Sequence, residues 1–237
     1  MNAQRLETVR KKIHGARLDA FLVTFLPHVR YLSGFSGSNG MCALLAERQY
    51  FLSDVRYRTQ SAEEVKEFHI VITKAGLFEE LKKRKVLPTK GRIGFEVQHV
   101  SVADLENLKT LFPRLRFVPT RGIVENVASV KDESEIEAMK QAAAMTDEVF
   151  HEVLPVIKEG VSETDIAAEI LYRHRKAGAE AEAFEPIVAS GLRGALPHAR
   201  ATARKINRGE LVTLDFGCRF RGYHSDLTRT VAVGNPP

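Results

Sequence analysis

The sequence predicts two domains, a layered α/β domain over residues 1–127 and an α+β domain over residues 128–237. The chain has 237 residues, and a length of this size suits two modest domains, since domains mostly run to about 100–200 residues. Short strand-like and helix-like segments alternate through the first half, which is typical of a layered α/β structure. In the second half two long helical patterns come first and strands follow as a block, which is an α+β order.

The first domain opens with a helical pattern, because Leu6, Val9 and Ile13 recur about once per helical turn. Ser101 and Asp104 form a capping-box-like start for a later helix. Gly34, Gly37 and Gly40 lack the GxGxxG spacing, so we interpret them as a loop and not as a phosphate site. Strands are predicted over residues 20–24, 69–73, 92–96 and 115–120, a hairpin over 41–46 and 48–53, and helices over 59–65 and 77–83.

The second domain begins with the longest predicted helix of the chain. Asp132 is its expected N-cap, Glu135 follows three residues later, and we expect the helix to close at Gly160. Ser162 with Asp165 predicts the start of a second helix that runs to about Lys176. Strand-like segments follow over residues 184–190, 211–220 and 223–233, and a loop rich in Gly, Ala and Arg separates the first two.

Composition excludes several classes of protein. No apolar run approaches the roughly 20 residues of a membrane span, and the N-terminus lacks the apolar core of a signal peptide, so we expect a cytoplasmic protein without a membrane partner. The net charge is +5, but Lys and Arg alternate with Asp and Glu along the chain, which argues against a nucleic-acid partner. The 2 Cys show no CxxC spacing, so a disulfide framework or a cysteine zinc site is not expected.

Two carboxylates are the most informative feature. Asp215 lies in an apolar strand, where an unpaired carboxylate would be costly to desolvate. A hairpin that turns around Phe220 and Arg221 would place Asp226 directly across from Asp215, with Cβ atoms roughly 4.5–5.5 Å apart. Such a pair must share either a proton or a cation. A bulge or longer loop around Gly222 would instead turn one side chain away, and on spacing alone a structural role for both residues stays open.

The stretch that contains both residues, LDFGCRFRGYHSDLTRT, closely resembles the metal-binding hairpin of the pita-bread metallopeptidases. This group includes methionine aminopeptidase, aminopeptidase P, prolidase and creatinase. YLSGFSGSNG and RQYFLSDVRYRTQ resemble the N-terminal domain of the proline-directed and creatinase branches, which methionine aminopeptidases lack. VKDESEIEAMKQAA resembles the opening helix of their catalytic domain. The resemblance therefore implies a creatinase-like N-terminal domain followed by a pita-bread catalytic domain.

The resemblance also implies an activity and a site. It implies a metal-dependent aminopeptidase that hydrolyses the Xaa-Pro bond at peptide N-termini through a hydroxide that bridges two metal ions, and a homodimer. Asp215 and Asp226 match two metal ligands, and His198 in LPHA matches a catalytic residue that lines the substrate pocket. The two divalent ions are expected to be Mn, with Co or Zn as alternatives.

Three alternatives stay open. A prolidase, which cleaves only Xaa-Pro dipeptides, shares every motif, whereas creatinase-like hydrolysis without metals is disfavoured by the retained carboxylates. A non-catalytic homologue that acts as a binding module is the third. In the family the remaining ligands are a His and two Glu that follow the hairpin, and neither residue type follows Asp226 here. We therefore expect the catalytic domain to be incomplete and the 237-residue chain to be inactive by itself.

Overall fold

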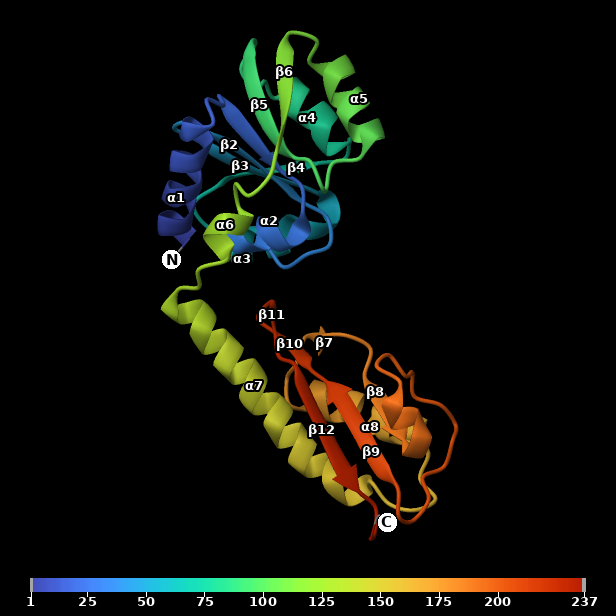
Figure 1. The fold of residues 1–237 in the computed structure, drawn as a ribbon. Coiled ribbons are helices and arrows are strands. Elements are labelled where there is room, and N and C mark those ends of the chain that lie inside the picture. The colour runs from blue at the N-terminus through green and yellow to red at the C-terminus, as the bar shows by residue number, and fades with distance from the viewer. Residues whose placement is uncertain (1, 236–237) are drawn as a thin grey trace. The chain divides into compact units, whose positions relative to one another are not determined.

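The computed structural model describes residues 2–235, in two compact units. The division falls after Val130, while the sequence placed the boundary after residue 127. Each unit has its own strands and helices, which Figure 1 labels. No helix within residues 2–235 is both long enough and apolar enough to cross a lipid bilayer.

The first unit is built on a six-stranded mixed sheet with the order β4-β3-β2-β1-β5-β6. The predicted hairpin is confirmed, because β2 and β3 pair antiparallel. β1 pairs antiparallel with β2 and parallel with β5, and the two remaining pairs, β3 with β4 and β5 with β6, are parallel. The strands are β1 (Ala20–Val23), β2 (Met41–Leu45), β3 (Gln49–Asp54), β4 (His69–Thr73), β5 (Gly91–Glu96) and β6 (Leu115–Thr120).

Helices cover both faces of this sheet (Figure 1). Alternate residues of β1 reach opposite cores, since Phe21 packs with one apolar cluster and Leu22 with the other. The capping box predicted at Ser101 and Asp104 is present. The helices are α1 (Asn2–Gly15), α2 (Leu26–Ser33), α3 (Arg58–Glu64), α4 (Leu77–Lys83), α5 (Val102–Leu111) and α6 (Glu125–Ala128), with a short 3₁₀ turn η1 (Val55–Tyr57).

The second unit starts with two helices, as predicted. Both capping boxes form, at Asp132 with Glu135 and at Ser162 with Asp165. The first helix, α7 (Glu133–Val153), ends earlier than the expected Gly160 and continues as the 3₁₀ turn η2 (Leu154–Val156). Pro155 explains the early end, because proline has no backbone N–H for the next helical hydrogen bond. The second helix is α8 (Glu163–Lys176).

The strands of the second unit form two small sheets, with the orders β12-β9-β8 and β11-β10-β7. The two long strands expected over 211–220 and 223–233 are each broken, at residue 217 and at residues 225–226. The strands are β7 (Ala181–Glu182), β8 (Ile187–Ser190), β9 (Leu211–Phe216), β10 (Cys218–Phe220), β11 (Tyr223–His224) and β12 (Leu227–Ala232), with a 3₁₀ turn η3 (Gly191–Ala195) after β8.

Strand β9 separates the core of this unit from its candidate site. Val212, Leu214 and Phe216 are fully buried and pack with apolar residues of α7 and α8. Thr213 and Asp215 are the intervening residues and therefore point to the opposite face of the sheet. The alternation in this strand thus buries one face and turns a carboxylate outward.

Candidate metal and substrate site

The hairpin that joins β10 and β11 sets the register of the site. Phe220 pairs with Tyr223, and the two residues between them, Arg221 and Gly222, have φ values of 50° and 84°. Positive φ at both central residues is the signature of a type I′ turn, whose twist matches that of the flanking strands. The turn therefore lies one residue later than the sequence analysis placed it.

Asp215 consequently pairs with Thr228 and not with Asp226. The prediction that the two carboxylates lie directly across from each other is wrong. Because the register differs by two residues, which is one full period of a strand, the same face is kept. Asp226 becomes a diagonal neighbour of Asp215, and diagonal neighbours in a sheet lie about 7–8 Å apart, with their Cβ atoms somewhat closer.

A close backbone approach interrupts both strands beside Asp226. A Cβ atom on Gly217 would lie 1.9 Å from the carbonyl oxygen of Ser225, which no side chain could tolerate. Gly217 and Ser225 thus lie in the break between β9 and β10 and between β11 and β12. The glycine lets the two chains approach each other at the point where Asp226 leaves the strand.

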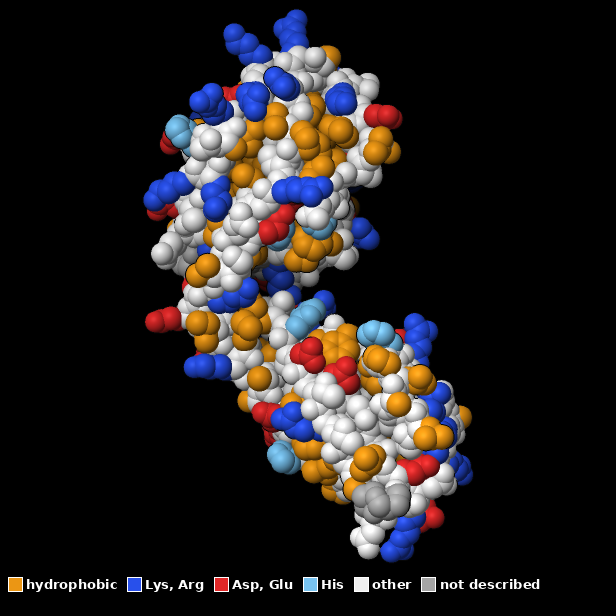
Figure 2. Space-filling view, in the orientation of Figure 1, with side chains coloured by type: hydrophobic (Ala, Val, Ile, Leu, Met, Phe, Trp, Pro, Cys, Tyr) orange, Lys and Arg blue, Asp and Glu red, His pale blue; other side chains and the backbone are white. Residues whose placement is uncertain are grey.

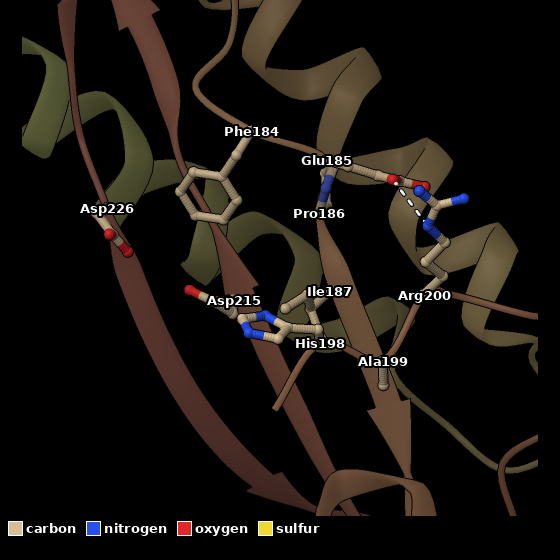
Figure 3. A pocket seen from close by; sticks show the side chains of 9 residues that line it. All are labelled: Phe184, Glu185, Pro186, Ile187, His198, Ala199, Arg200, Asp215 and Asp226. Atoms are coloured by element: carbon tan, nitrogen blue, oxygen red, sulfur yellow. Dashed lines mark ion pairs between the residues drawn. The ribbon is translucent and has the colours of Figure 1, made fainter. Parts of the chain in front are cut away.

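Asp215, Asp226 and His198 all line one open pocket of about 500 Å³. Figure 3 shows the two carboxylates turned toward one another, with the Phe184 ring and the His198 imidazole beside them. Asp226 and His198 are exposed, while Asp215 is half-buried. The other lining residues are Phe184, Glu185, Pro186, Ile187, Ala199 and Arg200.

Two polar contacts organise the pocket wall. The hydroxyl of Thr228 donates a hydrogen bond of 2.8 Å to Oδ1 of Asp215, which fixes the carboxylate from the neighbouring strand. At the rim, Arg200 Nε lies 3.3 Å from Glu185 Oε2. Figure 2 shows acidic and histidine side chains gathered around hydrophobic ones on one face of this unit.

A buried hydroxyl network lies behind the break in the strands, and sequence analysis missed it. The hydroxyls of Thr146 on α7 and Ser225 are 2.6 Å apart, and the amide of Cys218 donates to Ser225 Oγ at 2.9 Å. His174 on α8 lies 3.4 Å from Thr146 Oγ1 through Nε2. Burial lowers the pKa of His174 to about 4, so the imidazole is neutral at physiological pH.

The donor atoms fit a divalent metal ion in part. Carboxylate oxygens suit hard and borderline divalent ions, and Asp215 and Asp226 present theirs to the same pocket. Within residues 2–235 no group of three or more His, Cys, Asp or Glu side chains is placed to hold a metal ion. The described chain thus supplies two carboxylates and a neighbouring imidazole.

Comparison with known proteins identifies the family. Residues 5–130 match the creatinase/prolidase N-terminal domain, and residues 137–237 match metallopeptidase family M24. The chain belongs to metallopeptidase family M24. Within that family it falls in the prolidase and aminopeptidase P branch, as its resemblance to both domains implied. Membership implies divalent metal ions as cofactors.

Several relatives of this M24 chain are named as Xaa-Pro dipeptidases or aminopeptidases. The uncharacterized peptidase YqhT of Bacillus subtilis is 35% identical over 98% of the chain and 66% of its own length. The structure of the Xaa-Pro dipeptidase from Bacillus anthracis superposes with a TM-score of 0.93, at 36% identity over 100% of the chain and 66% of its own length. The structure of the X-Pro aminopeptidase from Thermotoga maritima superposes with a TM-score of 0.87, at 35% identity over 93% of the chain and 64% of its own length.

The M24 chain therefore spans about two thirds of the length of these relatives. Solved structures nevertheless align with as much as 100% of the chain. The comparisons thus give no support to the expectation that the second domain is incomplete or that the chain is inactive.

Proposed function

We propose that the protein containing this chain hydrolyses the Xaa-Pro bond at the N-terminus of peptides, as a metal-dependent aminopeptidase. The observation that carries the proposal is the shared pocket of Asp215, Asp226 and His198. These residues come from β9, from the segment before β12 and from the loop after η3. The hairpin register brings the two carboxylates together, and the loop after η3 brings His198 to the same cavity.

Asp215 and Asp226 would hold the metal ions through their carboxylate oxygens. We propose two divalent ions, with Mn as the expected metal and Co or Zn as alternatives. When bound, such ions lower the pKa of a water molecule and polarise the scissile carbonyl. The Thr228 hydroxyl donates a hydrogen bond of 2.8 Å to Oδ1 of Asp215, and such a contact restricts the rotation of a ligand carboxylate.

The pocket wall would bind the peptide. Phe184 and Ile187 lie beside the carboxylates (Figure 3), and Pro186 also lines the pocket, so these apolar side chains offer a surface for the proline ring. The exposed imidazole of His198 lines the same pocket and can hydrogen-bond to the substrate or to the intermediate. In this assignment the histidine acts on the peptide and not on the metal ions.

A dipeptidase is the second candidate, because the relative from Bacillus anthracis carries that name while the one from Thermotoga maritima is an aminopeptidase. Both enzymes would use the same pocket. Hydrolysis rates for Xaa-Pro dipeptides against longer Xaa-Pro-Yaa peptides separate them, and activity confined to dipeptides would contradict the aminopeptidase assignment. The partners we propose are a proline-containing peptide and a second copy of the chain in a homodimer.

The carboxylate assignment is tested by Asp226→Asn in the protein expressed from its full gene. The change removes one anionic ligand at almost constant volume, so we expect loss of most bound metal and most activity with an unchanged circular dichroism spectrum. Asp147→Asn is the matched control, because Asp147 is an exposed carboxylate of α7 outside the pocket lining. Wild-type metal content in the Asp226→Asn protein, measured by mass spectrometry, would refute the assignment.

The histidine assignment predicts a different pattern. His198→Ala should lower kcat by about 10²–10⁴-fold if the imidazole acts in proton transfer, and less if it only binds the substrate. Metal stoichiometry should stay at the wild-type value because His198 is assigned to the peptide. Loss of a metal ion from this variant would show that His198 is a metal ligand and would refute its assignment to the peptide.

A further inference from the structure

The segment that carries His198 has little secondary structure of its own. Between β8 and β9, residues 191–210 contain the turn η3 and a single antiparallel bridge from Lys205 to Ser162. His198 and most of its neighbours are exposed. A surface loop of this length is expected to be mobile unless its main chain is bound. The position of the imidazole therefore depends on what fixes the loop.

One buried carboxylate binds the chain on both sides of His198. Glu163, the first residue of α8, has a fully buried side chain. Its Oε1 accepts hydrogen bonds from the amide and hydroxyl of Ser190, at 2.8 and 2.9 Å. Its Oε2 accepts from the amide and hydroxyl of Thr202, at 3.0 and 2.8 Å. Glu163 thus joins the end of β8 to a point four residues beyond His198.

An arginine extends this contact into the loop. Arg193 Nε lies 3.2 Å from Glu163 Oε2, and its Nη2 donates to the carbonyl of Arg200 at 2.6 Å. Ala199, which stands between His198 and Arg200 in the chain, is buried. The main chain is therefore held on both sides of the histidine, while the imidazole itself stays exposed.

The carboxylate is not needed to cap its own helix. Ser162 is the N-cap of α8, and Asp165 completes the capping box. Burial by itself raises the pKa of Glu163, but the hydrogen bonds from Ser190 and Thr202 outweigh it and leave the pKa below its usual value. The ionised form is hence the one that the loop binds. A buried charge is costly unless it is fully hydrogen-bonded, so each donor lost from this cluster should loosen the loop.

We propose that Glu163 is a positioning residue, which fixes the loop of residues 191–202 and thereby places the His198 imidazole in the pocket. The inference rests on the proposed role of His198 in peptide hydrolysis. It adds a residue outside the pocket lining whose effect on catalysis passes through the histidine. A purely structural role would instead alter stability without a specific effect on His198.

Hydrogen exchange of the loop tests the positioning directly and without catalysis. In Glu163→Gln the side-chain NH2 faces the backbone amide of Ser190 or of Thr202, which can only donate, so at least one hydrogen bond of the cluster is lost. We expect exchange in peptides from residues 191–202 to accelerate by at least about tenfold, with α7 unchanged, and trypsin to cut faster after Arg193 and Arg200. Glu169→Gln is the control, since Glu169 lies on the same helix and pairs with Arg173 on the surface. Unchanged loop exchange in Glu163→Gln would overturn the proposal.

A double-mutant cycle tests the path through His198. Glu163→Gln should lower kcat by about 10- to 100-fold in the wild-type background, as expected for a displaced catalytic group, with metal content unchanged. In a His198→Ala background the same change should have almost no further effect. Equal losses in both backgrounds would show a structural role and refute the proposal. Thr202→Val, which removes a single donor, serves as the milder variant if Glu163→Gln does not fold.

The two tests separate the proposal from the function on which it rests. If Xaa-Pro peptides are not hydrolysed, the proposed function fails, and the exchange measurement still reports whether Glu163 fixes the loop. If peptides are hydrolysed but the cycle is additive, only the positioning role fails.

Discussion

Acid should destabilise the second unit through one buried histidine. His174 is 2% exposed, and burial lowers its pKa from 6.5 to about 4. Between these values the unfolded chain binds a proton that the folded chain does not, so the free energy of unfolding falls as the pH falls. The full shift corresponds to about 3 kcal/mol. Between pH 7 and pH 5 the loss amounts to about 2 kcal/mol.

Hydrogen exchange of α7 peptides at pH 7 and pH 5, corrected for intrinsic rates, measures this loss in the second unit alone. His174→Gln should remove the part of the pH dependence that this histidine causes, whatever it does to the stability at pH 7. His224, whose pKa burial also lowers, keeps its own part. His151→Gln is the matched control, because His151 lies exposed on α7 and should leave the dependence intact. The pKa values of the carboxyls Glu163, Asp165 and Glu210 are lowered, so these groups lose their contribution to stability mainly below this window. Equal losses in wild type and His174→Gln would refute the reasoning.

Two further changes probe the break in the strands. Gly217→Ala should destabilise the second unit by about 1–3 kcal/mol through overpacking, because its Cβ would meet the Ser225 carbonyl. Thermal unfolding measures the loss. Gly15→Ala is the control and should not destabilise the protein, because no atom lies within 4 Å of the added Cβ. Ser225→Ala should cost about 1–3 kcal/mol in urea unfolding, since the buried Cys218 amide loses its acceptor. A Ser225→Ala protein as stable as wild type would contradict that account.

Helix starts and strand faces could be predicted from the sequence because they depend on neighbours in the chain. Ser101 with Asp104, Asp132 with Glu135, and Ser162 with Asp165 all form capping boxes. Each is a reciprocal pair of hydrogen bonds over three residues, and no other part of the fold is needed to form it. The early end of α7 also has a local cause, in Pro155, whereas the short helices α2 and α6 were not predicted.

The register of the hairpin could not be predicted in the same way. A turn centred one residue earlier would satisfy the same alternation of buried and exposed residues. The register is set instead by Arg221 and Gly222, which adopt positive φ. Because the error was one full strand period, the face of Asp215 and Asp226 was predicted correctly although their pairing was not. The break at Gly217 depends on the Ser225 carbonyl, which only the paired chain supplies.

The sequence by itself predicted Asp215, Asp226 and His198 as candidate site residues, and it predicted that both carboxylates share one face. Only the tertiary structure decided that the histidine lies in their pocket, that Thr228 holds Asp215, and that Glu163 binds both ends of the loop. The physical reason is distance along the chain. A cap or an alternating strand gains its free energy within a few residues, whereas these contacts join segments that come together only when the core of β9, α7 and α8 is packed.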